Sequence, residues 1–172
     1  MMRAFRLYLG GLAALGGICA VVLAPAVEAA AGGPGAVGAV VRYAFMPFCH
    51  QDPARSIHLA GVCLPVCTRC AGIYLGAFLG WGLWWFMPAP GRDRPVTNRV
   101  LVLGFGPMVV DGIINLAGLC TSPGPVRFLT GLLFGATAAR AVWPAAIEAA
   151  ASITGPRESR LTPLAPLIPK GK

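Results

Sequence analysis

The residues with the greatest capacity for chemistry lie in one short stretch in the first half of the chain. Cys67 and Cys70 form a Cys-x-x-Cys pair with the spacing of a zinc knuckle, and Cys49 is followed directly by His50. Three thiols and an imidazole are soft ligands that suit zinc, Cu⁺ or an iron site. We therefore predict that Cys49, His50, Cys67 and Cys70 bind a transition metal such as zinc. His58 is a second candidate for the imidazole.

Two other functions fit the same residues. The Cys67–Cys70 pair precedes an apolar helical segment, where the helix dipole would stabilise a thiolate, and Arg69 lies between the two thiols. This arrangement suits a membrane thiol–disulfide oxidoreductase. In a purely structural alternative, disulfides tie the loop to the helices. That alternative draws on five cysteines: Cys49, Cys63, Cys67, Cys70 and Cys120.

The composition of the chain indicates an integral membrane protein. Of its 172 residues, 56% are hydrophobic and only 12% are charged, and the mean hydropathy is +0.71. A soluble domain has about 25% charged residues. The formal charge of +8 comes from Lys and Arg residues that flank apolar segments, without interleaved aromatic residues. This pattern predicts contact with a lipid bilayer and excludes nucleic acid as the expected partner.

Four apolar segments have about the length that crosses a bilayer: residues 7–27, 71–87, 100–119 and 127–147. We expect an all-α fold, an integral membrane bundle of about four transmembrane helices with an extracytoplasmic Cys/His-rich loop. The first segment also resembles a signal peptide, because Arg3 and Arg6 precede it and small residues follow it. Its length favours a retained helix.

The chain divides into three predicted regions. Residues 1–38 contain the first helix or signal peptide and a linker, and residues 39–151 contain the Cys/His loop and three transmembrane helices. Residues 152–172 are basic and rich in proline, which predicts a disordered cytoplasmic tail.

Charge asymmetry predicts the orientation in the cell membrane. With four spans and a cytoplasmic N-terminus, nine Lys and Arg residues face the cytoplasm and four face outside. The positive-inside rule favours this multi-pass topology with both termini cytoplasmic. The Cys/His loop is then extracytoplasmic.

Glycine spacing predicts close helix packing. Gly72, Gly76 and Gly80 recur every four residues and fall on one helix face, and Gly131 and Gly135 form a second such pair. Small residues in this pattern let two helix backbones approach each other. A homo-oligomer is also compatible with the sequence.

Polar residues from separate segments are expected to meet at the outer end of the bundle. Asp111 and Asn115 lie one turn apart in the third span, and Arg69 and Arg127 begin the flanking spans. A carboxylate within a span is costly and usually serves a function. We predict that these four residues bind a cofactor or substrate, a small molecule or ion whose identity is open. Asp111 could also hold the second nitrogen of a metal-binding His50.

The motifs together resemble an uncharacterised family of small prokaryotic predicted membrane proteins, a domain of unknown function. The resemblance covers about residues 45–140. It departs from the family pattern at Asn115, where glutamine is more common, and at Cys63 and Cys120, which lie outside the pattern. The residues that carry it are Cys49, His50, Gln51, Arg55, Ser56, Cys67, Arg69, Cys70, Gly72, Tyr74 and Gly76. The resemblance implies a membrane fold and no particular reaction.

Overall fold

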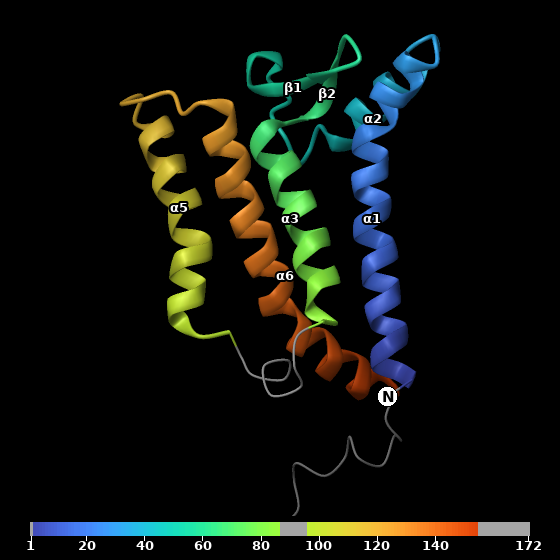
Figure 1. Cartoon of the computed structure of the whole chain (residues 1–172), viewed down its shortest axis with the longest axis vertical. Coiled ribbons are helices and arrows are strands. Elements are labelled where there is room, and N and C mark those ends of the chain that lie inside the picture. Colours follow the sequence, from blue (N-terminus) through green and yellow to red (C-terminus); the bar gives the residue numbers. More distant parts are fainter. Residues whose placement is uncertain (1, 87–95, 155–172) are drawn as a thin grey trace, which may run out of the picture.

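The computed structural model describes residues 2–86 and 96–154. Four long helices lie side by side, and a short helix and a β-hairpin cover one end of the bundle (Figure 1). The long helices are α1 (Met2–Ala30), α3 (Thr68–Trp84), α5 (Asn98–Leu116) and α6 (Gly124–Thr154). The covering elements are α2 (Ala36–Phe45), the 3₁₀ turn η1 (Pro53–Arg55), β1 (Ser56–Leu59) and β2 (Val62–Cys67).

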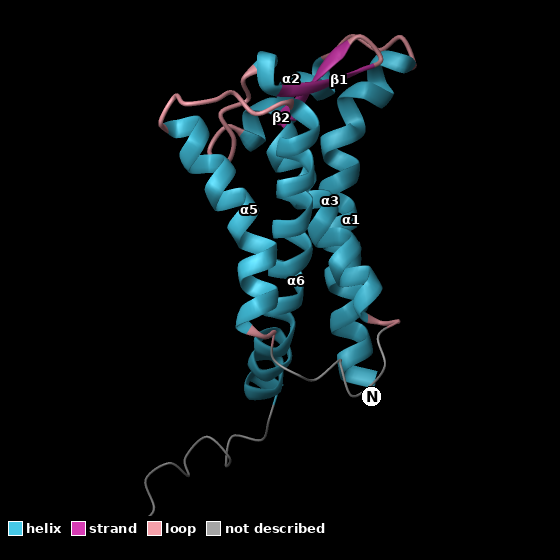
Figure 2. Ribbon diagram, turned by 60° about the vertical axis from the view of Figure 1, so that its left-hand side comes forward, coloured by secondary structure: helices cyan, strands magenta, loops and turns pink. Residues whose placement is uncertain are grey.

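The predicted helical bundle is largely confirmed, but the fold is not all-α. The segment between α2 and α3, which was expected to be a loop, contains a two-stranded antiparallel sheet (Figure 2). Within the described residues, Phe5–Ala30 of α1 and all of α5 are long and apolar enough to cross a membrane. Helix α3 has 17 residues. A bundle of four membrane spans therefore stays a prediction.

Helices α3 and α6 pack with their backbones in close contact, as the glycine spacing predicted. A Cβ atom at Gly76 would collide with the carbonyl of Leu132, and one at Gly80 would lie 2.7 Å from Cα of Ala136. The contact is reciprocal, because a Cβ atom at Gly135 would collide with the carbonyl of Ile73. Glycines on both helices remove the side chains that would otherwise separate them.

Helix α1 packs against α3 at the end of the bundle that is remote from the hairpin. The Trp81 indole donates a hydrogen bond to the carbonyl of Tyr8 (3.0 Å), and its ring lies against Gly11. The rings of Trp81 and Trp143 meet edge-on with their centroids 4.7 Å apart, so α6 joins the same cluster. Trp81 therefore lies between α1, α3 and α6.

The β-hairpin seals the other end of the bundle. Its turn is Ala60-Gly61, and both residues have positive φ (51° and 77°), the backbone geometry of a two-residue type I′ turn. Leu64 and Val66 in β2 are 2% and 0% exposed, and they pack against Val22 of α1. Burial of this apolar strand holds the start of α3 in place.

Both predicted region boundaries fall inside helices, one in α2 and one in α6. Helix α2 begins at Ala36, directly after Gly35, which has a φ of 81°. The boundary at residue 38 therefore lies inside the first turn of α2. Of the predicted disordered tail, residues 155–172 lie outside the described residues.

Candidate metal centre

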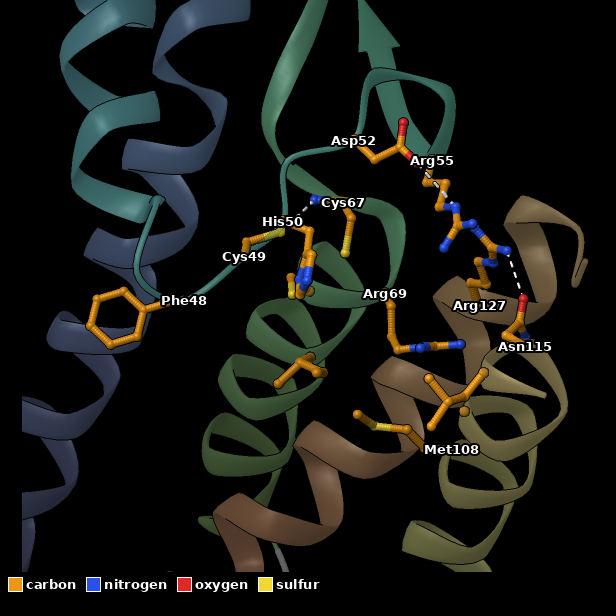
Figure 3. Close-up of a pocket in the computed structure, with 14 residues that line it drawn as sticks. Phe48, Cys49, His50, Asp52, Arg55, Cys67, Arg69, Met108, Asn115 and Arg127 are labelled. Atoms are coloured by element: carbon orange, nitrogen blue, oxygen red, sulfur yellow. Dashed lines mark hydrogen bonds and ion pairs between the residues drawn. The ribbon is translucent and has the colours of Figure 1, made fainter. Parts of the chain in front are cut away.

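Three thiols converge where the hairpin meets α3. Cys49 follows α2, Cys67 is the last residue of β2, and Cys70 lies in the first turn of α3. Their sulfur atoms all lie within 4.8 Å of one another (Figure 3). Thus the fold brings Cys49 to the Cys-x-x-Cys pair, although Cys49 and Cys67 are 18 positions apart in sequence.

Cys49 is held in place by backbone geometry and burial. Its N–H donates to the carbonyl of Phe45 (3.0 Å) as the chain leaves α2, and its side chain is buried with 6% exposed. Its sulfur accepts a hydrogen bond from the backbone N–H of Cys67 (3.1 Å). The next turn uses a positive φ of 52° at Gln51, whose side chain donates to the carbonyl of Arg42. This bend directs the chain from Cys49 to the hairpin.

Cys67 is the most acidic thiol of the cluster. It precedes α3 in extended conformation and lies at the helix N-terminus, where partial positive charge favours a thiolate. A hydrogen bond from the Cys70 thiol lowers the pKa of Cys67 to about 5, although partial burial opposes this shift. The pair therefore carries one thiolate at neutral pH. A thiolate is both a metal ligand and a nucleophile.

The predicted histidine ligand, His50, lies beside the three cysteines but outside the cluster that their sulfur atoms form. His50 is exposed and lines the same cavity as the three cysteines, whereas the group within 4.8 Å consists of sulfur atoms (Figure 3). His58 pairs with Cys63 in the hairpin, exposed, and does not line this cavity. Three of the four predicted ligands are therefore brought together, and the role of His50 stays a prediction.

The four residues predicted to bind a cofactor or substrate form one hydrogen-bonded network. Arg69 makes an ion pair with Asp111, which is 6% exposed. Asn115 donates to the Asp111 carboxylate (3.1 Å) and accepts a hydrogen bond from Arg127 (2.8 Å). The network joins α3, α5 and α6 at the hairpin end of the bundle. Among the described residues, Asp111 has no hydrogen bond to His50, so the predicted support of that imidazole is not seen.

Ser122 belongs to this network and was missed by sequence reasoning. Its hydroxyl donates to Asp111, and its backbone N–H donates to Asn115 (3.3 Å). Ser122 follows a turn in which Gly118 has a φ of 69°. A lone serine in a short connection carries no sequence signal, because its contact depends on how that turn folds back.

A cavity of about 650 Å³ joins the thiol cluster to this network (Figure 3). Its walls come from the segment after α2, from α3, from α5 and from Arg127 of α6. The lining residues are Phe48, Cys49, His50, Asp52, Arg55, Cys67, Arg69, Cys70, Ile73, Met108, Gly112, Asn115, Leu116 and Arg127. The thiols thus face a space that is large enough for a small organic molecule.

All six cysteines are free thiols in the structure. Cys63 and Cys120, which the structural alternative included among its disulfide candidates, lie outside the cluster. Cys120 is exposed, and Cys19 is half-buried within α1.

Comparison with known proteins identifies a family and two similar archaeal proteins. Residues 49–141 match a family described as "Predicted membrane protein (DUF2085)". An uncharacterized protein of Methanocaldococcus jannaschii is 35% identical over 100 residues, which cover 58% of this chain and 64% of that protein. An uncharacterized protein of Methanothermobacter thermautotrophicus is 39% identical over 88 residues, covering 51% of this chain and 78% of that protein. No solved structure matches the chain.

Proposed function

The chain belongs to the DUF2085 family of predicted membrane proteins, as its motifs indicated, and we propose that it binds a soft transition-metal ion through Cys49, Cys67 and Cys70. The observation that carries the proposal is the convergence of three sulfur atoms within 4.8 Å. A disulfide requires two thiols. A third thiol brought in from a separate segment and buried beside them is the arrangement of a metal centre.

The donor set fits zinc or Cu⁺. In tetrahedral zinc–thiolate sites the metal–sulfur distance is about 2.3 Å, which places neighbouring sulfurs about 3.8 Å apart. The observed spread of up to 4.8 Å is slightly larger. Rotation of a half-buried side chain such as that of Cys70 would shorten the sulfur–sulfur distances to this value. Soft sulfur ligands favour these ions over magnesium or calcium.

The fourth coordination position would face the cavity. His50 follows Cys49 directly and lines that cavity, so it is the nearest imidazole in sequence that could complete a four-ligand site. Without it, a water or a substrate atom would fill the position. A catalytic zinc site has three protein ligands and one exchangeable ligand, whereas a structural site is closed.

The second candidate function is thiol–disulfide exchange. The lowered pKa of Cys67, to about 5, and its place at the start of α3 are the observations that favour it. In that reaction the Cys67 thiolate attacks a substrate disulfide, which forms a mixed disulfide and releases one substrate thiol. Cys70 then loses its proton to the departing sulfur and attacks the Cys67 sulfur of the mixed disulfide, which releases the second substrate thiol. The substrate is reduced to two thiols, and Cys67 and Cys70 are oxidised to one disulfide.

We also propose that the chain crosses the membrane four times with the thiol cluster outside. The family description, the two helices that meet the criteria for a span and the charge asymmetry support this topology. An outer location matters for the site. Free thiols oxidise readily outside the cytoplasm, and a bound metal would keep Cys67 and Cys70 reduced.

Metal content and thiol count on the same detergent-purified sample test the proposal. We expect one equivalent of zinc or copper, lost in Cys70→Ser. The control is Cys120→Ser, which removes an exposed thiol outside the cluster and should leave the metal content unchanged. His50→Ala measures the role of the imidazole. Metal-free protein with Cys67 and Cys70 recovered as a reducible disulfide would overturn the metal site and favour the oxidoreductase.

A further inference from the structure

The cavity beside the thiol cluster has an excess of positive charge. Its lining contains three arginines, Arg55, Arg69 and Arg127, and one carboxylate, Asp52. The Asp52 carboxylate pairs with Arg55 (3.1 Å) at the exposed rim. The deeper part of the lining therefore carries two guanidinium groups, and the Asp111 carboxylate behind them is not part of the cavity wall.

Arg127 is the group whose charge is least compensated. Arg127 is 6% exposed, and its guanidinium donates a hydrogen bond to the neutral amide oxygen of Asn115 (2.8 Å). Within the described ranges, 2–86 and 96–154, its Nε atom has no hydrogen-bond partner, and Nε of Arg69 has none either. A guanidinium does not lose its proton in a protein, so its burial requires a compensating anion.

Among the described residues, no anion of the protein pairs with Arg127. The Asp111 carboxylate already accepts hydrogen bonds from Arg69, Ser122 and Asn115. No ion pair joins Arg127 to a carboxylate, and no hydrogen bond joins either guanidinium to a cysteine sulfur, the Cys67 thiolate included, in the part of the chain that is described. The buried Arg127 and the partly buried Arg69 thus share one carboxylate.

Part of the cavity wall is apolar and has room. Ile73 of α3 and Met108 of α5 line the cavity, and a Cβ atom at Gly112 would meet no atom within 4 Å. An inorganic oxyanion would occupy only a small part of about 650 Å³. The shape and polarity therefore suit a ligand with a charged head and an apolar body.

We propose that this cavity binds an organic oxyanion, a phosphate or carboxylate group carried on an apolar body, through the guanidinium groups of Arg127 and Arg69. The oxyanion accepts hydrogen bonds from the guanidinium groups of these two arginines, which line the cavity, and the apolar body lies along Ile73 and Met108. A planar guanidinium matches such oxyanions in geometry and charge. This inference does not depend on a metal at the cysteines.

The same chemistry could come from an anionic lipid headgroup or from a soluble phosphate ester. Native mass spectrometry of the full chain in detergent, titrated with dioleoylphosphatidylglycerol or with zwitterionic dioleoylphosphatidylcholine, tests the first source. Thermal stabilisation by hexyl phosphate, compared with inorganic phosphate, tests the second. We expect selective, saturable binding of the anionic organic probe in one of these experiments.

Two variants make the test specific. Arg127→Gln should weaken binding at least tenfold, while Arg99→Gln, an exposed arginine outside the cavity, should not change it. Gly112→Leu adds an apolar side chain to the cavity wall, where a Cβ atom meets no atom within 4 Å, and should also weaken binding at least tenfold. Its control is Gly106→Leu in the same helix. Gly106 does not line the cavity, and a Cβ atom at this position has space.

Each outcome decides the proposal. Binding of phosphatidylglycerol or of hexyl phosphate that falls in Arg127→Gln and Gly112→Leu, but not in their controls, supports it and identifies the source. The inference is overturned if no probe binds, or if binding is equal in Arg127→Gln and wild type. Binding that is lost in Cys67→Ser but kept in Arg127→Gln also overturns it, because the ligand would then belong to the metal centre.

Discussion

Cys67 is the residue of the thiol cluster whose pKa is lowered by its neighbours. Because the Cys70 thiol donates a hydrogen bond to it, the pKa of Cys67 is lowered to about 5. We expect metal-free protein to react with iodoacetamide in a pH-dependent way, with a midpoint near pH 5. An ordinary thiol gives a midpoint about three to four units higher. Rates measured by mass spectrometry between pH 4 and 10 check this.

The control for this prediction is Cys67→Ser. It removes the acidic thiol, and Cys70 then lacks the thiolate that it stabilises. The low-pH reactivity should disappear, while Cys120, which is exposed and outside the cluster, continues to be labelled. A wild-type profile that has no phase below pH 7 would contradict the assignment.

The buried ion pair between Arg69 and Asp111 is expected to matter for stability. Asp111→Asn removes the carboxylate that Arg69, Ser122 and Asn115 all contact. Breaking a buried pair from one side typically costs about 3–5 kcal/mol, because the partner charge stays buried. Thermal unfolding in detergent should show a clear decrease in Tm.

The same Asp→Asn substitution at an exposed ion pair shows how much of the stability effect at Asp111 comes from burial of the pair. Asp52 pairs with Arg55, and the exposed fractions of the two side chains are 42% and 55%. Asp52→Asn should change stability by less than about 1 kcal/mol, because solvent screens an exposed pair. Equal decreases in stability for Asp52→Asn and Asp111→Asn would contradict the expected stabilisation of the fold by the Asp111 network.

At the level of the elements, the glycine contact between α3 and α6 organises the bundle. Gly76→Leu would drive a side chain into the backbone carbonyl of Leu132, so we expect destabilisation at the upper end of the usual 1–3 kcal/mol for overpacking. Gly17→Leu in α1 is the control, since a Cβ atom there meets no atom within 4 Å. The Tm of both variants in detergent measures the difference.

The difference in Tm between the two variants reports on packing at the helix face that contains Gly76. Both substitutions raise helix propensity by a similar amount, so propensity alone would raise both Tm values. A lower Tm for Gly76→Leu together with an unchanged or higher one for Gly17→Leu would establish the packed face. If Gly76→Leu left the Tm unchanged, that face would have to be turned toward lipid.

For the whole molecule, the proposed topology places the hairpin outside the cell. In a background with Cys63→Ser and Cys120→Ser, a cysteine introduced at Ala60 in the hairpin turn should react with a membrane-impermeant maleimide on intact cells. A cysteine introduced at Thr97, at the opposite end of the bundle, should react only after the membrane is permeabilised. Both positions are exposed, so access depends on the membrane rather than on burial.

The reverse pattern would invert the topology. Labelling at Thr97 in intact cells, with none at Ala60, would place the thiol cluster on the cytoplasmic side. Reduced thiols persist there without a metal, so that result would also remove one argument for the metal centre.

Much of this protein could be predicted from residue types and their spacing. The apolar segments, the Cys67–Cys70 pair before a helix and the glycines at intervals of four residues are local patterns with local causes. The backbone contact at Gly76 followed directly from the period of the helix. The gathering of Asp111, Asn115, Arg69 and Arg127 also followed, because their positions along the expected helices placed them at the same end of the bundle.

Only the tertiary structure decided which of these groups touch. The hairpin that buries Leu64 and Val66 brings Cys49 to the thiol pair, and the bend at Gln51 leaves His50 exposed outside the sulfur group. The turn after α5 brings Ser122 to Asp111, and the packing of α6 leaves Nε of Arg127 without a partner among the described residues. Such contacts depend on turn geometry and side-chain direction between segments distant in sequence, and helical periodicity carries no information about either.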